Sequence, residues 1–233
     1  MTTAPQFDRN GNLPEMHEGV RVTLNGEPSP LLSVSRDHVD FIAPEGLASS
    51  AEGERVELKV ELGGQLVASY DLFANRANPR FFARGNSPWE RFAAALNQDG
   101  TVNSRRNPAR AGESISLFLN SAGAPAMPVA AGKRMESAGA WSTLRPTLTG
   151  VSSGIQTMPF GSTWEIGYFG VAPGLASGTL QLNATIPASV AAEALPPGEA
   201  MKLGVAAIVL AAPPEEPGQI GRIWTDLVNV WVS

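Results

Sequence analysis

The stretch Glu54–Phe73 reads ERVELKVELGGQLVASYDLF, and it is the segment that decides the fold class. Its first nine residues alternate between apolar and charged side chains, the period-two pattern of a β-strand with one buried face. Gly63 and Gly64 follow, a pair that accepts the positive φ angles of a tight hairpin turn. The stretch therefore predicts a β-hairpin over residues 54–73.

Short apolar runs of the same kind recur along the chain, and turn dipeptides or prolines separate them. The chain contains 24 glycines and 19 prolines, so long helices are not expected. Two short helices are predicted, over residues 88–95 and 188–195. We predict an all-β fold, whose further strands are Val20–Leu24, Val39–Ile42, Glu113–Leu119, Leu180–Pro187, Lys202–Leu210 and Asp226–Val232.

Composition excludes several classes of protein. The 233 residues carry a formal net charge of −5, which argues against a nucleic-acid-binding domain, and the absence of cysteine excludes disulfides. The longest apolar run, Val205–Ala212, is too short to span a membrane. The first residues lack the basic and apolar regions of a secretory leader, so the chain as given predicts none.

Three stretches resemble one known family. Ala95–Ser104 reads ALNQDGTVNS, Val22–Ser35 reads VTLNGEPSPLLSVS, and Leu182–Pro187 reads LNATIP. These motifs are similar to those of the repeated C-terminal domain of large secreted proteins from Solibacter and other acidobacteria. The resemblance covers roughly residues 19–233.

The resemblance implies two immunoglobulin-like β-sandwich domains of the IPT/TIG type, and no known catalytic or ligand residue. We expect an N-terminal extension at residues 1–18, a first sandwich at 19–77 and a second at 78–233. The implied function is that of a non-catalytic structural or interaction module, extracellular or at the cell surface, with an unknown protein or glycan partner. The alternatives are a carbohydrate-binding or accessory domain of an exported enzyme, and a filament or surface-layer subunit.

Catalytic signals are weak. Gly150–Gly154 satisfies the G-x-S-x-G pattern around Ser152, but Pro159 stands too close for the helix that such a nucleophile requires. We therefore predict a turn there. His17 and His38 are the only possible histidine bases, and both are expected at the surface. We predict no catalytic residue and no enzymatic activity.

Metal and cofactor signals are similarly weak. Two histidines and no cysteine make a zinc site improbable, and no phosphate-binding loop is found. The segments around Asp8 and Asp99 are rich in oxygen side chains, but the segment from Asp8 lacks the glutamate that closes an EF-hand loop. We interpret both as turns, and calcium binding at either stays open. We expect no cofactor.

Five tryptophans are the remaining candidates for an interaction site. Trp89, Trp141 and Trp224 lie near loops and could bind a protein or a sugar, whereas a core position is expected for Trp164 and Trp231.

A last expectation concerns the edge of the first sandwich. Only polar residues stand where the resembling family has an opening strand, so one sheet edge should be open to an added strand. The strand could come from residues 1–12, from residues 220–232 or from a neighbouring subunit, and we expect the chain to complete itself.

Overall fold

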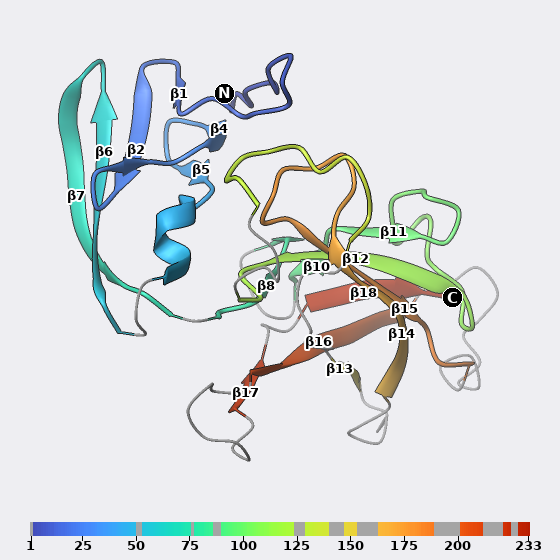
Figure 1. Ribbon diagram of the computed structural model, residues 1–233. Coiled ribbons are helices and arrows are strands. Elements are labelled where there is room, and N and C mark those ends of the chain that lie inside the picture. The colour runs from blue at the N-terminus through green and yellow to red at the C-terminus, as the bar shows by residue number, and fades with distance from the viewer. Residues whose placement is uncertain are drawn as a thin grey trace. The chain divides into compact units, whose positions relative to one another are not determined.

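The computed structural model describes residues 2–49, 53–75, 77–85, 90–123, 129–139, 147–152, 163–188, 201–211, 221–224 and 228–233; over 147–152, 201–211 and 221–224 it describes the backbone. Strands in several antiparallel sheets dominate, which confirms the all-β prediction (Figure 1). The longest helical element of the described residues is the 3₁₀ helix η1 (Glu45–Ser49).

The chain forms two compact units that are each assembled from distant segments. Unit 1 comprises residues 1–76, 124–139 and 171–179, and unit 2 comprises residues 77–123, 140–170 and 180–233. The first unit therefore includes two segments that lie within the predicted second domain. The chain returns to unit 1 twice after leaving it. No single position in the sequence therefore separates the two units.

Unit 1 contains a five-stranded sheet and a two-stranded sheet. The larger sheet has the order β1 (Met16–His17), β2 (Val20–Leu24), β6 (Arg55–Leu62) and β7 (Gln65–Phe73), and β3 (Glu27–Pro28) pairs with β2. The smaller sheet pairs β4 (Leu31–Val34) with β5 (Val39–Phe41). The core forms where Val22, Leu31 and Val34 pack together.

The hairpin predicted over residues 54–73 is confirmed. Strands β6 and β7 pair antiparallel from Arg55↔Phe73 to Leu62↔Gln65. Gly63 and Gly64 have φ angles of 60° and 81°, the left-handed region that two-residue hairpin turns require. A bulge between Val60 and Glu61 shifts the register near the turn.

The N-terminal segment packs within unit 1. The backbone N–H of Thr3 donates to the Val34 carbonyl and the N–H of Val34 donates to the Thr3 carbonyl, both at 2.8 Å. Leu31 N–H donates to the Pro14 carbonyl at 2.9 Å. Residues 1–18 therefore extend the edge of β4 and support β2, and they leave the edge of β7 uncovered.

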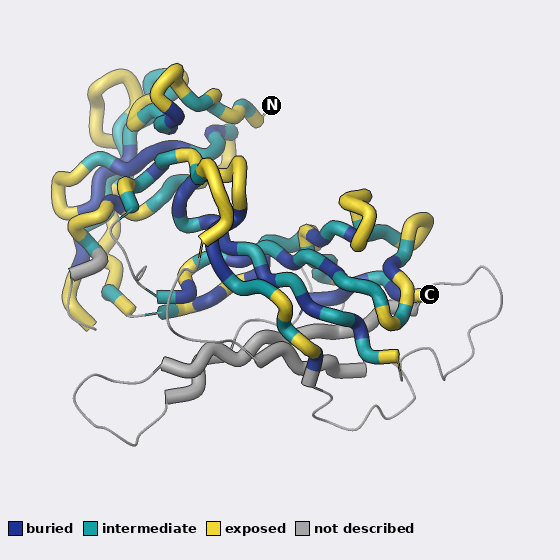
Figure 2. Tube along the Cα trace, turned by 45° about the vertical axis from the view of Figure 1, so that its right-hand side comes forward, coloured by how far each residue is buried: buried dark blue, intermediate teal, exposed yellow. Residues whose placement is uncertain are grey.

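Unit 2 is built on a long mixed sheet. Its order is β11-β12-β15-β14-β13-β16-β18-β10-β9, with β8 on β12 and β17 on β16. The buried residues of β12, β15 and β18 form its core, and Figure 2 colours the backbone at buried residues dark blue. The strands are β8 (Arg80–Phe81), β9 (Ala83–Arg84), β10 (Phe92–Ala93), β11 (Ala95–Asn97), β12 (Ser114–Asn120), β13 (Thr147–Ser152), β14 (Thr163–Val171), β15 (Leu180–Thr185), β16 (Met201–Ala211), β17 (Gly221–Trp224) and β18 (Val228–Val232).

Two local predictions are wrong. Residues 92, 93 and 95 of the predicted helix 88–95 lie in strands, because β10 pairs with β9 and β18, and β11 pairs with β12. Gly150, Val151 and Ser152 lie in β13 and pair with β16 instead of forming the predicted turn, whereas Ser153 and Gly154 lie outside the described residues. In both cases pairing with distant strands overrides the local signal. Of the helix predicted over 188–195, residues 189–195 lie outside the described part of the chain.

Candidate functional site

Strand β7 forms one edge of the unit 1 sheet. Of the strands that the structure describes, only β6 pairs with it, and no strand lies beyond it in the sheet order (Figure 1). The opposite edge, β1, is two residues long, whereas β7 is nine residues long. A free edge of this length presents a row of backbone N–H and C=O groups that can pair with another strand.

The apolar face of the sheet continues onto β7 without being covered there. Val56, Leu58 and Val60 of β6 stand opposite Leu72, Tyr70 and Ala68 of β7, and opposite residues of an antiparallel pair share a face. The β6 side of this face packs on the unit 1 core. Tyr70 is 60% exposed and Leu72 is 42% exposed. The core therefore ends at β6, and β7 extends past it.

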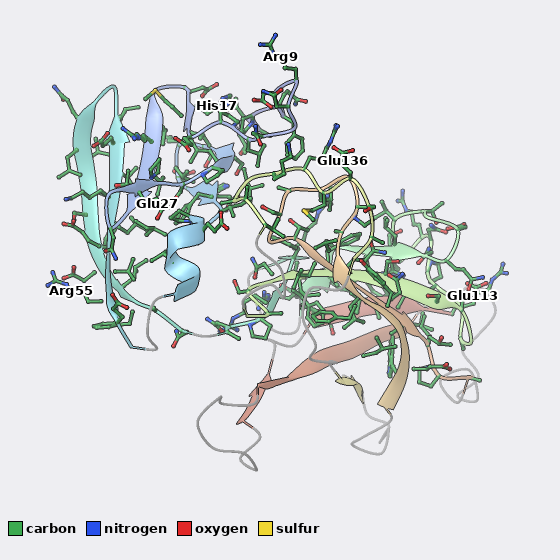
Figure 3. All side chains as sticks on the ribbon, viewed as in Figure 1. Arg9, His17, Glu27, Arg55, Glu113 and Glu136 are labelled. Carbon is green, nitrogen blue, oxygen red and sulfur yellow. The ribbon has the colours of Figure 1, made fainter. Side chains whose placement is uncertain are left out.

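The other face of the hairpin carries its charged residues, which pair with one another, together with the exposed Phe73. Glu57 and Asp71 stand opposite each other, which would be repulsive if neither had a cation nearby. The Arg55 guanidinium binds the Asp71 carboxylate at 2.7 Å, and Lys59 binds Glu57 at 2.7 Å. Arg55 lies on the outer part of the hairpin (Figure 3). Asp71, the one charged residue of β7, is thus already paired.

Natural edge strands usually carry lysine, proline, inward-pointing charges or a β-bulge, features that discourage pairing. β7 has no lysine, arginine or proline, and its one such feature is the bulge at Val67, near the turn. Eight of its nine residues are exposed. Its apolar exposed side chains are Leu66, Val67, Tyr70, Leu72 and Phe73, at 56%, 58%, 60%, 42% and 68%. We call β7 with these side chains the β7 edge.

The predicted tryptophan site is not assembled by the described residues. Trp89 and Trp141 lie outside them, and Trp224 lies in β17, where only the backbone is described. Trp164 is buried, as predicted. Trp231 is half-buried: its ring stacks on Phe92 with centroids 5.0 Å apart.

A polar network surrounds Trp231. The Arg105 guanidinium carbon lies 6.0 Å from the centroid of the Trp231 ring. Asn103 Nδ2 donates to the Trp231 carbonyl at 2.8 Å, and Trp231 N–H donates to Asn103 Oδ1 at 2.8 Å. Because Phe92 stacks on this ring and Arg105 lies near it, Trp231 is a poor platform for a sugar.

The oxygen-rich segment around Asp99 is held by its own hydrogen bonds. Asp99 Oδ1 accepts from the backbone N–H of Thr101 at 2.9 Å and from its hydroxyl at 2.6 Å. The bond from the Thr101 hydroxyl is the largest cause that lowers the pKa of the Asp99 carboxyl. Asn97 and Asn107 add further side-chain bonds to the same loop. The local oxygens thus serve the loop itself.

The Asp8 segment is a second loop of this kind. Asp8 Oδ1 accepts from the backbone N–H groups of Asn10 and Asn12, each at 2.8 Å. Hydrogen bonding to Asn12 is the main cause that lowers the pKa of the Asp8 carboxyl. Lys133 donates to the Asn10 carbonyl. In the described part of the chain, no group of three or more His, Cys, Asp or Glu residues could hold a metal ion.

A serine, a histidine and an aspartate do meet in the β4–β5 turn, a constellation that the sequence did not suggest. Ser35 Oγ lies 2.8 Å from His38 Nδ1, and His38 Nε2 lies 4.0 Å from Asp40 Oδ2. Ser35 Oγ also accepts from the N–H groups of Asp37 and His38. The serine therefore closes the turn, and the histidine–aspartate distance exceeds a hydrogen bond.

These three residues make a poor hydrolytic site. The side chains of His38 and Asp40 are 56% and 60% exposed, whereas catalysis of this type requires a histidine that a buried carboxylate orients. Ser152 lies in unit 2 and His38 in unit 1. His17 is half-buried in β1 rather than at the surface, and His38 is exposed as predicted.

The comparisons add no relative: no protein-family model, curated protein or solved structure matches the chain. Among the described residues, no helix has the length and hydropathy to cross a membrane. Of the nine large apolar side chains that are exposed among the described residues, five belong to the β7 edge.

Proposed function

We propose that this chain is a non-catalytic interaction module that binds an extended polypeptide segment at the β7 edge. The segment adds a strand to the unit 1 sheet, antiparallel or parallel to β7. Backbone hydrogen bonds would supply affinity, and side chains on alternate positions would supply specificity. The extracellular or cell-surface setting implied by the family resemblance belongs to this proposal.

One observation carries the proposal: a nine-residue edge strand exposes five large apolar side chains and carries one charged residue. Isolated exposed apolar residues are ordinary on protein surfaces, but five of them on one free edge strand, spread over both of its faces, are typical of an interaction site. The uncovered continuation of the core face over Tyr70 and Leu72 gives the added strand an apolar surface to cover.

Strand β6 pairs with one edge of β7 in this chain, and the test offers a peptide of the same sequence to the opposite, free edge. A fluorescein-labelled peptide of residues 54–62 carries the β6 sequence, and binding to the full chain is followed by fluorescence anisotropy. We expect saturable binding that Leu72→Lys weakens at least tenfold, because a lysine there places a charge in the apolar row. The control is Val102→Lys, since Val102 is 68% exposed and lies in unit 2.

Two results would contradict the proposal. Either no saturable binding occurs, or Leu72→Lys and Val102→Lys bind the peptide equally well. Circular dichroism of both variants confirms that the fold is intact, and the exposure of both positions makes this the expected result.

A further inference from the structure

We infer that the strand bound at the β7 edge is the β7 of a second copy of this chain, and that the two copies form a closed two-fold dimer. This inference rests on the proposed function, because it names the partner of the same edge. Two features of β7 support it: its symmetric pattern of side chains and the pairing of its charge.

Antiparallel pairing of β7 with its own copy has a register, centred on Tyr70, in which the opposite side chains are compatible. With the two-fold axis at Tyr70, Tyr70 faces Tyr70 of the second copy and Ala68 faces Leu72. In the same register Phe73 lies nearest Val67, the extra residue of the β7 bulge, so apolar side chains are brought next to apolar side chains. Opposite residues of an antiparallel pair interact directly, and aromatic pairs and small-with-large pairs pack well.

The neighbouring registers are worse. Moving the axis to Ser69 places Asp71 opposite Val67, and moving it to Asp71 places two carboxylates opposite each other, which is repulsive. A shift by a single residue along one strand would pair the apolar face of one copy with the polar face of the other. The Tyr70 register avoids all three conflicts.

The charges allow the two edges to approach. In the Tyr70 register Asp71 faces Ser69, whose hydroxyl can donate to the carboxylate. Arg55 already binds Asp71 at 2.7 Å, so each copy brings a neutralised pair to the contact. Of the nine residues of β7, only Asp71 is charged, and therefore no unpaired like charges meet at the axis.

The size of the contact predicts a weak dimer. Covering the exposed parts of five such side chains on each copy removes on the order of 600 Å² of apolar surface, below the roughly 1,200 Å² of standard interfaces. A dissociation constant on the order of 10 µM is therefore expected. Because a two-fold contact uses the same edge on both copies, it closes at two chains and does not propagate into a filament.

The chain has no cysteine, so single cysteines report the register directly. We expect Tyr70→Cys to form a disulfide-linked dimer on mild oxidation, because opposite Cα atoms in an antiparallel pair lie roughly 4.5–5.5 Å apart, within disulfide range. The matched control is Ser69→Cys, which is displaced by two residues from its own copy in this register. It should cross-link at least tenfold more slowly.

Sedimentation equilibrium of the unmodified chain between 1 and 500 µM (roughly a tenth to fifty times the expected dissociation constant) measures the dimer without any substitution. We expect a monomer–dimer equilibrium, which Tyr70→Lys shifts at least tenfold toward monomer because it places two lysines opposite each other. The control Val102→Lys adds the same charge outside β7 and should leave the equilibrium unchanged.

A monomer at every concentration, assemblies larger than a dimer, equal dimerisation of Tyr70→Lys, or cross-linking of Ser69→Cys as fast as Tyr70→Cys would each overturn the inference. The peptide experiment distinguishes failure of the dimer from failure of strand addition at the β7 edge. If the 54–62 peptide binds the β7 edge while the chain stays monomeric, the dimer is wrong and strand addition stands. If neither occurs, the proposed function is wrong as well.

Discussion

Asn103 holds the Asn97–Asn107 loop to the last strand, and its truncation should destabilise unit 2. Its amide makes three hydrogen bonds: Nδ2 donates to Asn97 Oδ1 at 2.9 Å and to the Trp231 carbonyl at 2.8 Å, and Oδ1 accepts from Trp231 N–H at 2.8 Å. The amide therefore pairs with the Trp231 backbone as a neighbouring strand would.

The cost of Asn103→Ala follows from these bonds. Each half-buried hydrogen bond contributes about 0.5–1.5 kcal/mol net, and the Trp231 N–H loses its partner. The Trp231 carbonyl keeps a bond from Ala109 N–H at 3.0 Å, so we expect a loss of about 2–3 kcal/mol in the free energy of unfolding.

Urea unfolding followed by tryptophan fluorescence measures this loss, and Val102→Ala in the same loop is the control. Val102 is 68% exposed, and its truncation should change the free energy by less than about 0.5 kcal/mol. If Asn103→Ala costs no more than Val102→Ala, the side-chain network does not secure the loop and the reasoning fails.

Three further predictions test other parts of the structure. Leu117→Ala should cost about 2–5 kcal/mol by thermal or urea unfolding because Leu117 is fully buried in β12; a cost below about 1 kcal/mol would mean that β12 is not part of the core. Thr101→Val should raise the pKa of Asp99 toward its ordinary value, measured by NMR titration, because the Thr101 hydroxyl bond lowers it. The stabilising effect of a lowered carboxyl pKa is present above the ordinary pKa and is lost as pH falls through the lowered value, so wild type but not Thr101→Val should lose this contribution in acid. An unchanged Asp99 titration would contradict this assignment. Ser35→Ala should leave hydrolysis of p-nitrophenyl acetate at the wild-type level while lowering stability by about 1 kcal/mol; a wild-type rate that exceeds the variant's tenfold would make the turn a catalytic site.

Much of the strand content could be predicted from the sequence. Apolar and polar residues that alternate along a segment, and that end at a glycine or proline, are a local signal. Strand β2 matches its predicted bounds, and the hairpin over residues 54–73 forms as expected. The return of residues 124–139 and 171–179 to unit 1 could not be predicted, since it depends on contacts between distant segments. The register of β13 with β16 could not be predicted for the same reason, since it also depends on contacts between distant segments.

The candidate site was only half predictable. The sequence predicts an open sheet edge near the first sandwich, which residues 1–12, residues 220–232 or a neighbouring subunit could cover. Thr3 instead pairs with Val34 at β4, and β7 is left free. The alternation of Leu66, Ala68, Tyr70 and Leu72 predicts a strand with one apolar face, but it carries no information about whether a second layer covers that face. Only the packed structure places the end of the core at β6.

Hydrogen exchange at the backbone amides of β7 tests the central claim most directly, because strand addition must protect amides at the free edge. The full chain is labelled with and without a saturating amount of the 54–62 peptide, and exchange is followed by NMR residue by residue from Gln65 to Phe73. We predict that alternate amides of β7 slow at least tenfold on peptide addition while the amides of β12 do not change. Unchanged exchange along β7 at saturating peptide would contradict the claim that this edge accepts a strand.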